Sequence, residues 1–124
     1  MIQTITPIDN TIYVEREYNS KIIEKTISNS VIAQNEWGSL KVEERVDLLK
    51  KFVADFLSKE KQIIEEITRQ MGRPISQALN ELKGFKERAD YMLSIADEKL
   101  KNIYLPEKEN FKNYIKRIPM GVSF

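Results

Sequence analysis

The sequence predicts a mainly α-helical segment in which four helices are flanked by two β-hairpins and followed by the start of a further strand. Three observations lead to this prediction. Apolar residues recur every three or four positions between residues 20 and 100, as in amphipathic helices. They alternate with polar residues near both ends, as in strands. Gly72 and Pro74 divide the central part, because glycine accepts a left-handed helix end and proline cannot continue a helix.

The first 16 residues favour a β-hairpin. Residues 12–14 (Ile-Tyr-Val) are good strand formers, and a second β-prone run precedes them. Between the two runs stand Pro7, Ile8, Asp9 and Asn10, of which the last two tolerate left-handed backbone geometry. We therefore expect a tight connection between two antiparallel strands.

Two helices are predicted next. The first extends from Ser20 to Trp37, with Asn19 or Ser20 as its N-cap and Gly38 at its end. Its apolar stripe consists of Ile23, Ile27 and Val31. The second begins at Ser39 or just after it and breaks near Ser58. Its stripe consists of Val42, Val46, Leu49, Val53 and either Phe56 or Leu57.

Two more helices complete the central part, which we expect to form a compact four-helix core. The shorter helix ends at Gly72. It is expected to bury Ile63, Ile64, Ile67 and Met71, and to expose Glu65, Glu66 and Arg69. The longer helix is predicted from Ile75 to Leu100. Its inner face is expected to comprise Ala78, Leu82, Phe85, Ala89, either Met92 or Leu93, and Ala96.

The last part of the chain returns to an alternating pattern. Residues 102–106 and 111–119 are predicted to form a hairpin around a polar turn at residues 106–110. An isolated two-stranded ribbon is marginally stable in water, so we expect a further strand or chain to complete it. The apolar run from Pro119 to Phe124 has no polar ending, and we expect it to open a strand that continues in a larger protein.

Composition excludes several kinds of site. The chain has no cysteine and no histidine, which excludes disulfides, cysteine nucleophiles, Ser-His-Asp triads and histidine-ligated zinc within these residues. Twenty basic and nineteen acidic residues are interspersed, which gives no electrostatic footprint for nucleic acid. No apolar run approaches the ~20 residues needed to cross a bilayer, and no secretory signal begins the chain. We expect a soluble cytoplasmic protein with no metal.

Two local features bear on chemistry. The adjacent carboxylates at Glu43-Glu44 and Glu65-Glu66 point about 100° apart on a helix, so solvated helix faces are favoured over a catalytic pair. Gly84 interrupts a good helix at a cost of about 1 kcal/mol relative to alanine. Close packing at Gly84 is favoured over a passing ligand. No glycine-rich phosphate loop is present.

The order of these elements resembles the N-terminal part of the NAD(P)-dependent aldehyde dehydrogenase superfamily. The resemblance spans essentially the whole chain. It is carried by Trp37 and the E-R…L-L…F pattern of the second helix, the Gly72-Arg73-Pro74 stop, Glu81 in the following helix, and the terminal P-M-G-V from Pro119 to Val122. The family's nucleophilic cysteine, general-base glutamate, oxyanion-stabilising asparagine and cofactor-holding loop lie beyond the matched part. The resemblance therefore assigns no catalytic or cofactor-binding residue to this chain.

The resemblance implies an α/β parent fold with a Rossmann-type cofactor domain. Residues 1–100 would be the hairpin and helical part of that domain, residues 101–118 a hairpin of the oligomerisation arm, and residues 119–124 the start of its first strand. NAD or NADP would bind the intact parent rather than this chain. The partners would be the rest of the dehydrogenase or another subunit, through residues 101–118. Gly84 and Phe85 are the candidates for lining a substrate channel.

Three hypotheses remain open at this stage. The first is a catalytically inactive N-terminal piece of an aldehyde dehydrogenase. The second is a free-standing helical interaction module that associates with a full-length dehydrogenase. The third is an unrelated helical bundle with a structural role.

Overall fold

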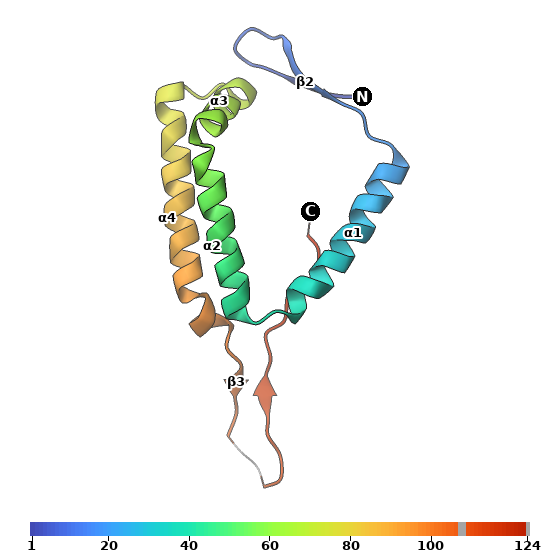
Figure 1. Cartoon of the computed structure of the whole chain (residues 1–124), viewed down its shortest axis with the longest axis vertical. Coiled ribbons are helices and arrows are strands. Elements are labelled where there is room, and N and C mark those ends of the chain that lie inside the picture. Colours follow the sequence, from blue (N-terminus) through green and yellow to red (C-terminus); the bar gives the residue numbers. More distant parts are fainter. Residues whose placement is uncertain (107–108, 124) are drawn as a thin grey trace.

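The computed structural model describes residues 1–106 and 109–123, and Figure 1 shows the arrangement of its elements. Four helices lie between two small antiparallel hairpins, in the predicted order. The elements are β1 (Ile2–Ile5), β2 (Ile12–Arg16), α1 (Ser20–Ser39), α2 (Val42–Ser58), α3 (Glu60–Met71), α4 (Ile75–Leu100), β3 (Ile103–Tyr104) and β4 (Tyr114–Ile115).

The packed part of the molecule is formed by α2, α3 and α4. Helices α2 and α4 lie side by side, and α3 turns across their end (Figure 1). The buried apolar residues of the described chain are Val53 on α2 and Ala78 and Leu82 on α4, with Ala78 fully inaccessible to solvent. Ala78 and Leu82 are four positions apart, so both project from one face of α4. The core is therefore small and lies between α4 and its two neighbours.

The structure shows which of Met92 and Leu93 belongs to the inner face of α4. Leu93 is half-buried and lines a hollow against α2 with Val53, whereas Met92 is 62% exposed. Leu93 rather than Met92 therefore continues the inner face. The predicted bounds of this helix, Ile75 to Leu100, are confirmed.

Helix α1 stands apart from the other three helices (Figure 1), so the prediction of a compact four-helix core is wrong. Its predicted cap is confirmed, because the Asn19 side chain accepts a hydrogen bond from the Ile22 amide at 2.9 Å. The helix continues two residues past Trp37, through Gly38. Its stripe is exposed: Ile23, Ile27 and Val31 are 42–49% accessible to solvent, and α1 does not share the close packing that joins α2, α3 and α4. Sequence periodicity identified an apolar face but not whether anything covers it.

The N-terminal hairpin forms as predicted. Strands β1 and β2 pair antiparallel, with an irregularity after Thr4 where Ile5 faces Ile12. Thr6 is buried and closes the turn, since its amide donates to the Thr11 carbonyl at 2.9 Å. Asn10 adopts the expected left-handed conformation, with φ 61°.

The α3–α4 corner depends on Gly72. Its φ is 71°, and its amide donates to the Thr68 carbonyl at 2.9 Å, which is the predicted glycine ending of a helix. The hairpin also approaches this corner closely. A Cβ added at Gly72 would lie 2.8 Å from Cγ of Pro7. The absence of a side chain at Gly72 therefore allows the left-handed helix end and also leaves room for Pro7 of the hairpin.

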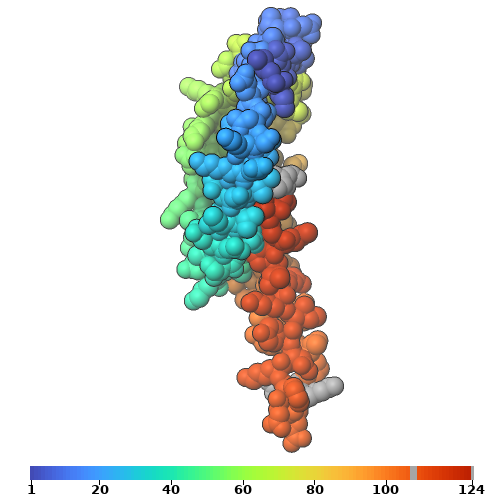
Figure 2. All heavy atoms as spheres, turned by 90° about the vertical axis from the view of Figure 1, so that its right-hand side faces the viewer, coloured from blue at the N-terminus to red at the C-terminus, as the bar shows by residue number. Residues whose placement is uncertain are grey.

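The C-terminal hairpin extends away from the helices as a narrow arm (Figures 1 and 2). Only two residues of each strand pair, Ile103 with Ile115 and Tyr104 with Tyr114, so the strands are much shorter than predicted. Part of the predicted turn, residues 107–108, lies outside the described residues. Residues 119–123 make no strand here, and Phe124 lies outside the described part, so the strand predicted at 119–124 stays a prediction.

Candidate functional site

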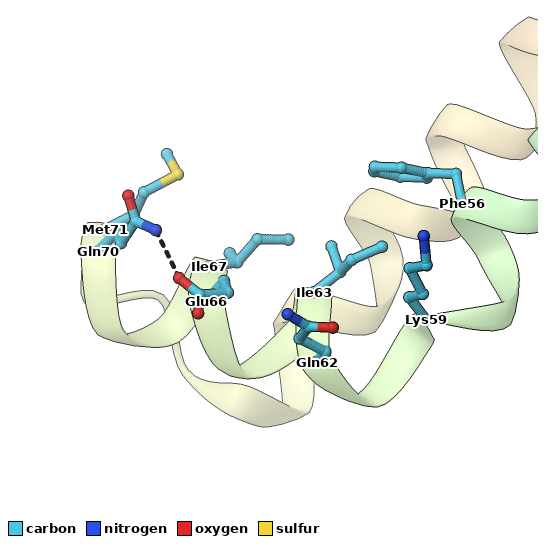
Figure 3. A pocket seen from close by; sticks show the side chains of 8 residues that line it. All are labelled: Phe56, Lys59, Gln62, Ile63, Glu66, Ile67, Gln70 and Met71. Carbon is cyan, nitrogen blue, oxygen red and sulfur yellow. Dashed lines mark hydrogen bonds between the residues drawn. The ribbon is translucent and has the colours of Figure 1, made fainter. Parts of the chain in front are cut away.

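An apolar groove of about 310 Å³ lies along α3 and the end of α2 (Figure 3). Its apolar residues come from one side of the two helices, because Ile63, Ile67 and Met71 are spaced by four positions and Phe56 lies one turn before the break between α2 and α3. Polar side chains border the groove. They are Lys59, Gln62, Glu66 and Gln70. An apolar floor with a polar border is typical of a surface that packs against another protein segment.

The groove corrects the burial predicted for the third helix. Met71 is 72% exposed, and no residue of α3 is fully buried. Ile63, Ile64 and Ile67 are half-buried, so one part of the stripe contacts α4 while the other remains open. The physical reason is geometric: a short helix lying across the end of a two-helix pair is covered on one side alone.

Glu66 links the border of the groove to the N-terminal hairpin. Its carboxylate accepts hydrogen bonds from the Gln70 amide at 2.6 Å and from the Tyr13 hydroxyl at 2.9 Å. These bonds, that of Gln70 first, hold the pKa of Glu66 below its ordinary value, and the bond to Glu66 raises the pKa of Tyr13. The Arg69 guanidinium lies 5.8 Å from the centre of the Tyr13 ring. Glu66 was predicted to face water, but it anchors β2.

Phe85 and Gly84, the predicted channel residues, have different surroundings. The Phe85 ring packs against Phe56, with ring centres 4.8 Å apart, and it also lines a shallow hollow of about 300 Å³ with Met92 and Arg88. A Cβ at Gly84 would meet nothing closer than the Arg88 guanidinium at 4.0 Å. Close packing therefore does not explain Gly84, which corrects that interpretation. Lining of a substrate channel by these two residues stays a prediction.

Three phenylalanine rings form a row across α2 and α4. Phe52 and Phe56 have ring centres 5.9 Å apart, and Phe56 continues to Phe85. Phe56 lines the α3 groove and Phe85 lines the hollow on α4, so the row joins the two surfaces. Tilted rings at these distances stabilise one another beyond their burial. The row therefore forms an apolar contact between α2 and α4.

The acidic pairs serve local structure. Glu44 accepts the Lys41 amide at 2.8 Å and so caps the start of α2, where Glu43 and Glu44 also meet the positive end of the helix. Glu65 pairs with Arg69 at 3.3 Å. In the part of the chain that the structure describes, no three His, Cys, Asp or Glu side chains come together as metal ligands would.

Sequence reasoning missed the groove and the contact between Tyr13 and Glu66. One signal for the groove was available: the stripe on α3 ends in Met71, immediately before a glycine stop, where the chain turns away. The contact joins residues 53 positions apart and left no local signal.

Comparison with known proteins places this arrangement in a family. The family model described as the aldehyde dehydrogenase family matches residues 1–124. The chain belongs to the aldehyde dehydrogenase family. No curated protein matches it.

Solved aldehyde dehydrogenases share the fold. Succinic semialdehyde dehydrogenase from Streptococcus pyogenes, solved with NADP+, superposes with a TM-score of 0.75 at 23% identity over 90% of this chain and 25% of its own. NAD-dependent benzaldehyde dehydrogenase from Corynebacterium glutamicum has a TM-score of 0.74 at 17% identity, with 88% and 24% covered. At these identities the likeness concerns the fold. The predicted aldehyde dehydrogenase-like fold, mainly helical here with two small hairpins, is confirmed.

The chain spans about a quarter of the length of the solved dehydrogenases that it matches. Within residues 1–106 and 109–123, no helix combines the length and apolarity needed to cross a bilayer.

Proposed function

We propose that these residues form the N-terminal segment of an NAD(P)-dependent aldehyde dehydrogenase, in which they support the cofactor-binding domain and subunit association. The observation that carries the proposal is the family match over residues 1–124 together with coverage of only a quarter of the solved relatives. The family resemblance gives this segment a supporting role, with the reacting groups elsewhere.

The exposed apolar faces support this assignment. Stable monomers rarely expose large contiguous apolar patches. Here the α1 stripe, the α3 groove and both faces of the arm are open. A larger protein would cover these faces, and burial would stabilise each at roughly 25 cal/mol per Å².

Residues 101–118 supply the arm. Apolar and aromatic side chains lie exposed along it, and they are Ile103, Tyr104, Leu105, Phe111, Tyr114, Ile115 and Ile118. Each strand of the ribbon has an outer edge with unpaired backbone groups, which favours pairing with a strand of another subunit or of the same protein. We assign this arm to oligomerisation. Residues 1–100 then form the outer helical part of the cofactor domain, and residues 119–124 begin its first strand.

The proposed parent reaction is oxidation of an aldehyde to a carboxylic acid. In the intact parent, a thiolate would add to the carbonyl carbon, NAD+ or NADP+ would supply the hydride acceptor, and water would then release the carboxylic acid and regenerate the thiolate. No cysteine occurs in these 124 residues, so this chain supplies no nucleophile for that step. Its contribution is positional: Phe85 and the row of rings would fix one wall beside the site.

Two measurements test the proposal together. The nucleotide sequence after codon 124 should encode a continuation with a cysteine and a nucleotide-binding region, and the intact product should reduce NAD+ or NADP+ with an aldehyde. The purified 124-residue chain should give no aldehyde-dependent reduction. A stop codon directly after Phe124 in an intact gene, or turnover by the chain alone, would overturn the proposal.

A second candidate function is a free-standing module that associates with a full-length dehydrogenase. This candidate is favoured by the arm, which projects from the packed helices (Figure 2) and carries exposed apolar side chains. A monodisperse chain that melts cooperatively and binds a dehydrogenase through the arm would support the module over the segment.

A further inference from the structure

A polar pocket of about 550 Å³ is larger than the apolar groove on α3. Three segments form it: residues 38–45 at the start of α2, residues 97–102 at the end of α4, and residues 116–119 after β4. These segments are far apart in the sequence and meet only because the chain returns past the ends of both helices. The volume is within the usual range for small-molecule sites, about 300–1,000 Å³.

The lining of this pocket has an excess of positive charge. Five basic side chains line it, which are Lys41, Arg45, Lys101, Lys116 and Arg117. Two acidic residues, Glu43 and Asp97, also line it. Asp97 is already paired with Lys101, at 2.8 Å, and this partner lowers the pKa of Asp97. Apart from this pair, four basic side chains and one carboxylate, that of Glu43, line the pocket. The formal net charge of the whole chain is only +1.

Arg45 carries a polar atom that lacks a partner. Its Nε is buried, and none of the described residues accepts a hydrogen bond from it. The Nε–H group of Arg45 can donate a hydrogen bond to an anion bound in the pocket that this residue lines. The residue lines the pocket one turn after the start of α2, where the helix dipole also favours negative charge.

Arg117 is oriented by the backbone. Its Nη1 donates a hydrogen bond to the Lys99 carbonyl in the last turn of α4. This bond uses one of the five guanidinium donors and holds the others beside the pocket. Two guanidinium groups, from α2 and from the segment after β4, thus border one cavity.

We propose that this pocket binds a dianionic phosphate group, either as free phosphate or as the phosphate of a small ester. Arginine forks match the geometry of phosphate oxygens, and charge-assisted hydrogen bonds to them are about twice as strong as neutral ones. The buried Nε of Arg45 would gain its acceptor in the complex. All lining residues of this pocket lie within the described segments.

Isothermal titration calorimetry of the full chain tests this assignment. The two probes are inorganic phosphate and phenyl phosphate, each added at constant ionic strength. Saturable binding of one or both is expected. If phenyl phosphate binds more tightly than inorganic phosphate, the pocket also holds the organic group of a phosphate ester. If the two affinities are equal, the pocket is a site for free phosphate.

Matched variants separate the pocket from general electrostatics. Arg45→Gln and Arg117→Gln should each weaken binding about tenfold or more, since a hydrogen bond to a charged group contributes about 1.5–3 kcal/mol. Lys50→Gln removes the same charge from a part of α2 that does not line this pocket, where Lys50 lies 3.7 Å from Asp47, and it should leave affinity unchanged. Arg45→Lys keeps the positive charge but loses the planar guanidinium, which can donate two parallel hydrogen bonds to phosphate. This variant should also weaken binding if the fold is retained.

The proposal fails if neither probe shows saturable binding at millimolar concentration. It also fails if Lys50→Gln weakens binding as much as Arg45→Gln. Circular dichroism of each variant checks helix content. Should Arg45→Gln lose helix, the comparison of Arg117→Gln with Lys50→Gln decides the result.

Discussion

At the scale of single residues, two glycines of the helical part have different roles. Gly72 has a φ of 71° and faces Pro7, whereas Gly84 lies in a regular helix beside open space. The first is required by backbone conformation and by close approach. The second weakens its helix without a contact that explains it. Matched substitutions at these positions distinguish the two roles.

Gly72→Ala should lower the free energy of unfolding by at least about 1 kcal/mol, because an alanine in the left-handed region is strained and its Cβ would collide with Pro7. Gly84→Ala should raise the free energy of unfolding by up to about 1 kcal/mol, since alanine favours a helix interior. Urea unfolding followed by circular dichroism measures both. Equal effects at the two positions would contradict this account of Gly72.

The pairing of Tyr13 with Glu66 makes a prediction about pH. The pKa of Glu66 is lowered in the folded chain, so its contribution to stability is present above its ordinary pKa and is lost as pH falls through the folded pKa. Tyr13→Phe should raise the pKa of Glu66, but not fully, because the Gln70 bond is the larger cause. Carboxyl chemical shifts followed by NMR measure this pKa. Tyr18→Phe, at an exposed tyrosine, is the control and should leave it unchanged.

At the scale of elements, the four helices fall into two classes. Helices α2, α3 and α4 share a core, whereas α1 has an equally regular apolar stripe that stays open. Local signals describe both classes equally well. Asn19 caps α1 as predicted, and the Gly72 stop divides α3 from α4. Packing, rather than helix formation, distinguishes the two classes.

Leu82→Ala should therefore cost about 2–5 kcal/mol in the free energy of unfolding, because Leu82 is 3% exposed and its removal leaves a cavity. Ile27→Ala, on the open stripe of α1, should change it by no more than about 0.5 kcal/mol. Thermal and urea unfolding of both variants measure the difference. A large loss at Ile27 would mean that α1 packs on a partner in solution.

The arm gives a prediction for the intact protein. Ile115 is half exposed on the paired part of the ribbon, and an aspartate there would bring charge into an apolar interface. Ile115→Asp should shift the intact protein toward smaller assemblies in analytical ultracentrifugation. Lys112→Asp, in the same arm before the paired residues, is the control and should not. An unchanged assembly in the Ile115 variant would contradict the role assigned to the arm.

At the scale of the whole molecule, the open apolar surface predicts how the isolated chain behaves. The α1 stripe, the α3 groove and the arm are exposed together, and such surfaces bind one another or a hydrophobic dye. The 124-residue chain alone should enhance 8-anilinonaphthalene-1-sulfonate fluorescence and self-associate with rising concentration. The intact protein should do neither to the same extent. Fluorescence and light scattering measure the two effects.

Local sequence determined the order of the elements and several of their ends. The Asn19 cap, the left-handed Asn10 and Gly72 and the Ile75–Leu100 helix all follow from interactions within a few residues, and such interactions can be read from the chain. The ordered motifs also led to the family, which the family match confirmed. The sequence predicted the surroundings of the candidate site residues less well. Phe85 borders a hollow, but a side chain at Gly84 would contact only the Arg88 guanidinium.

Only the tertiary structure decided which apolar stripes are covered and which charges meet. Burial depends on whether a complementary face is present at the right place, and no spacing along one helix contains that information. The α1 and α4 stripes are alike in pattern, yet Leu82 is buried and Ile27 is open. The contact of Tyr13 with Glu66 and the basic pocket likewise join segments far apart in the chain, where only the path of the backbone brings them together.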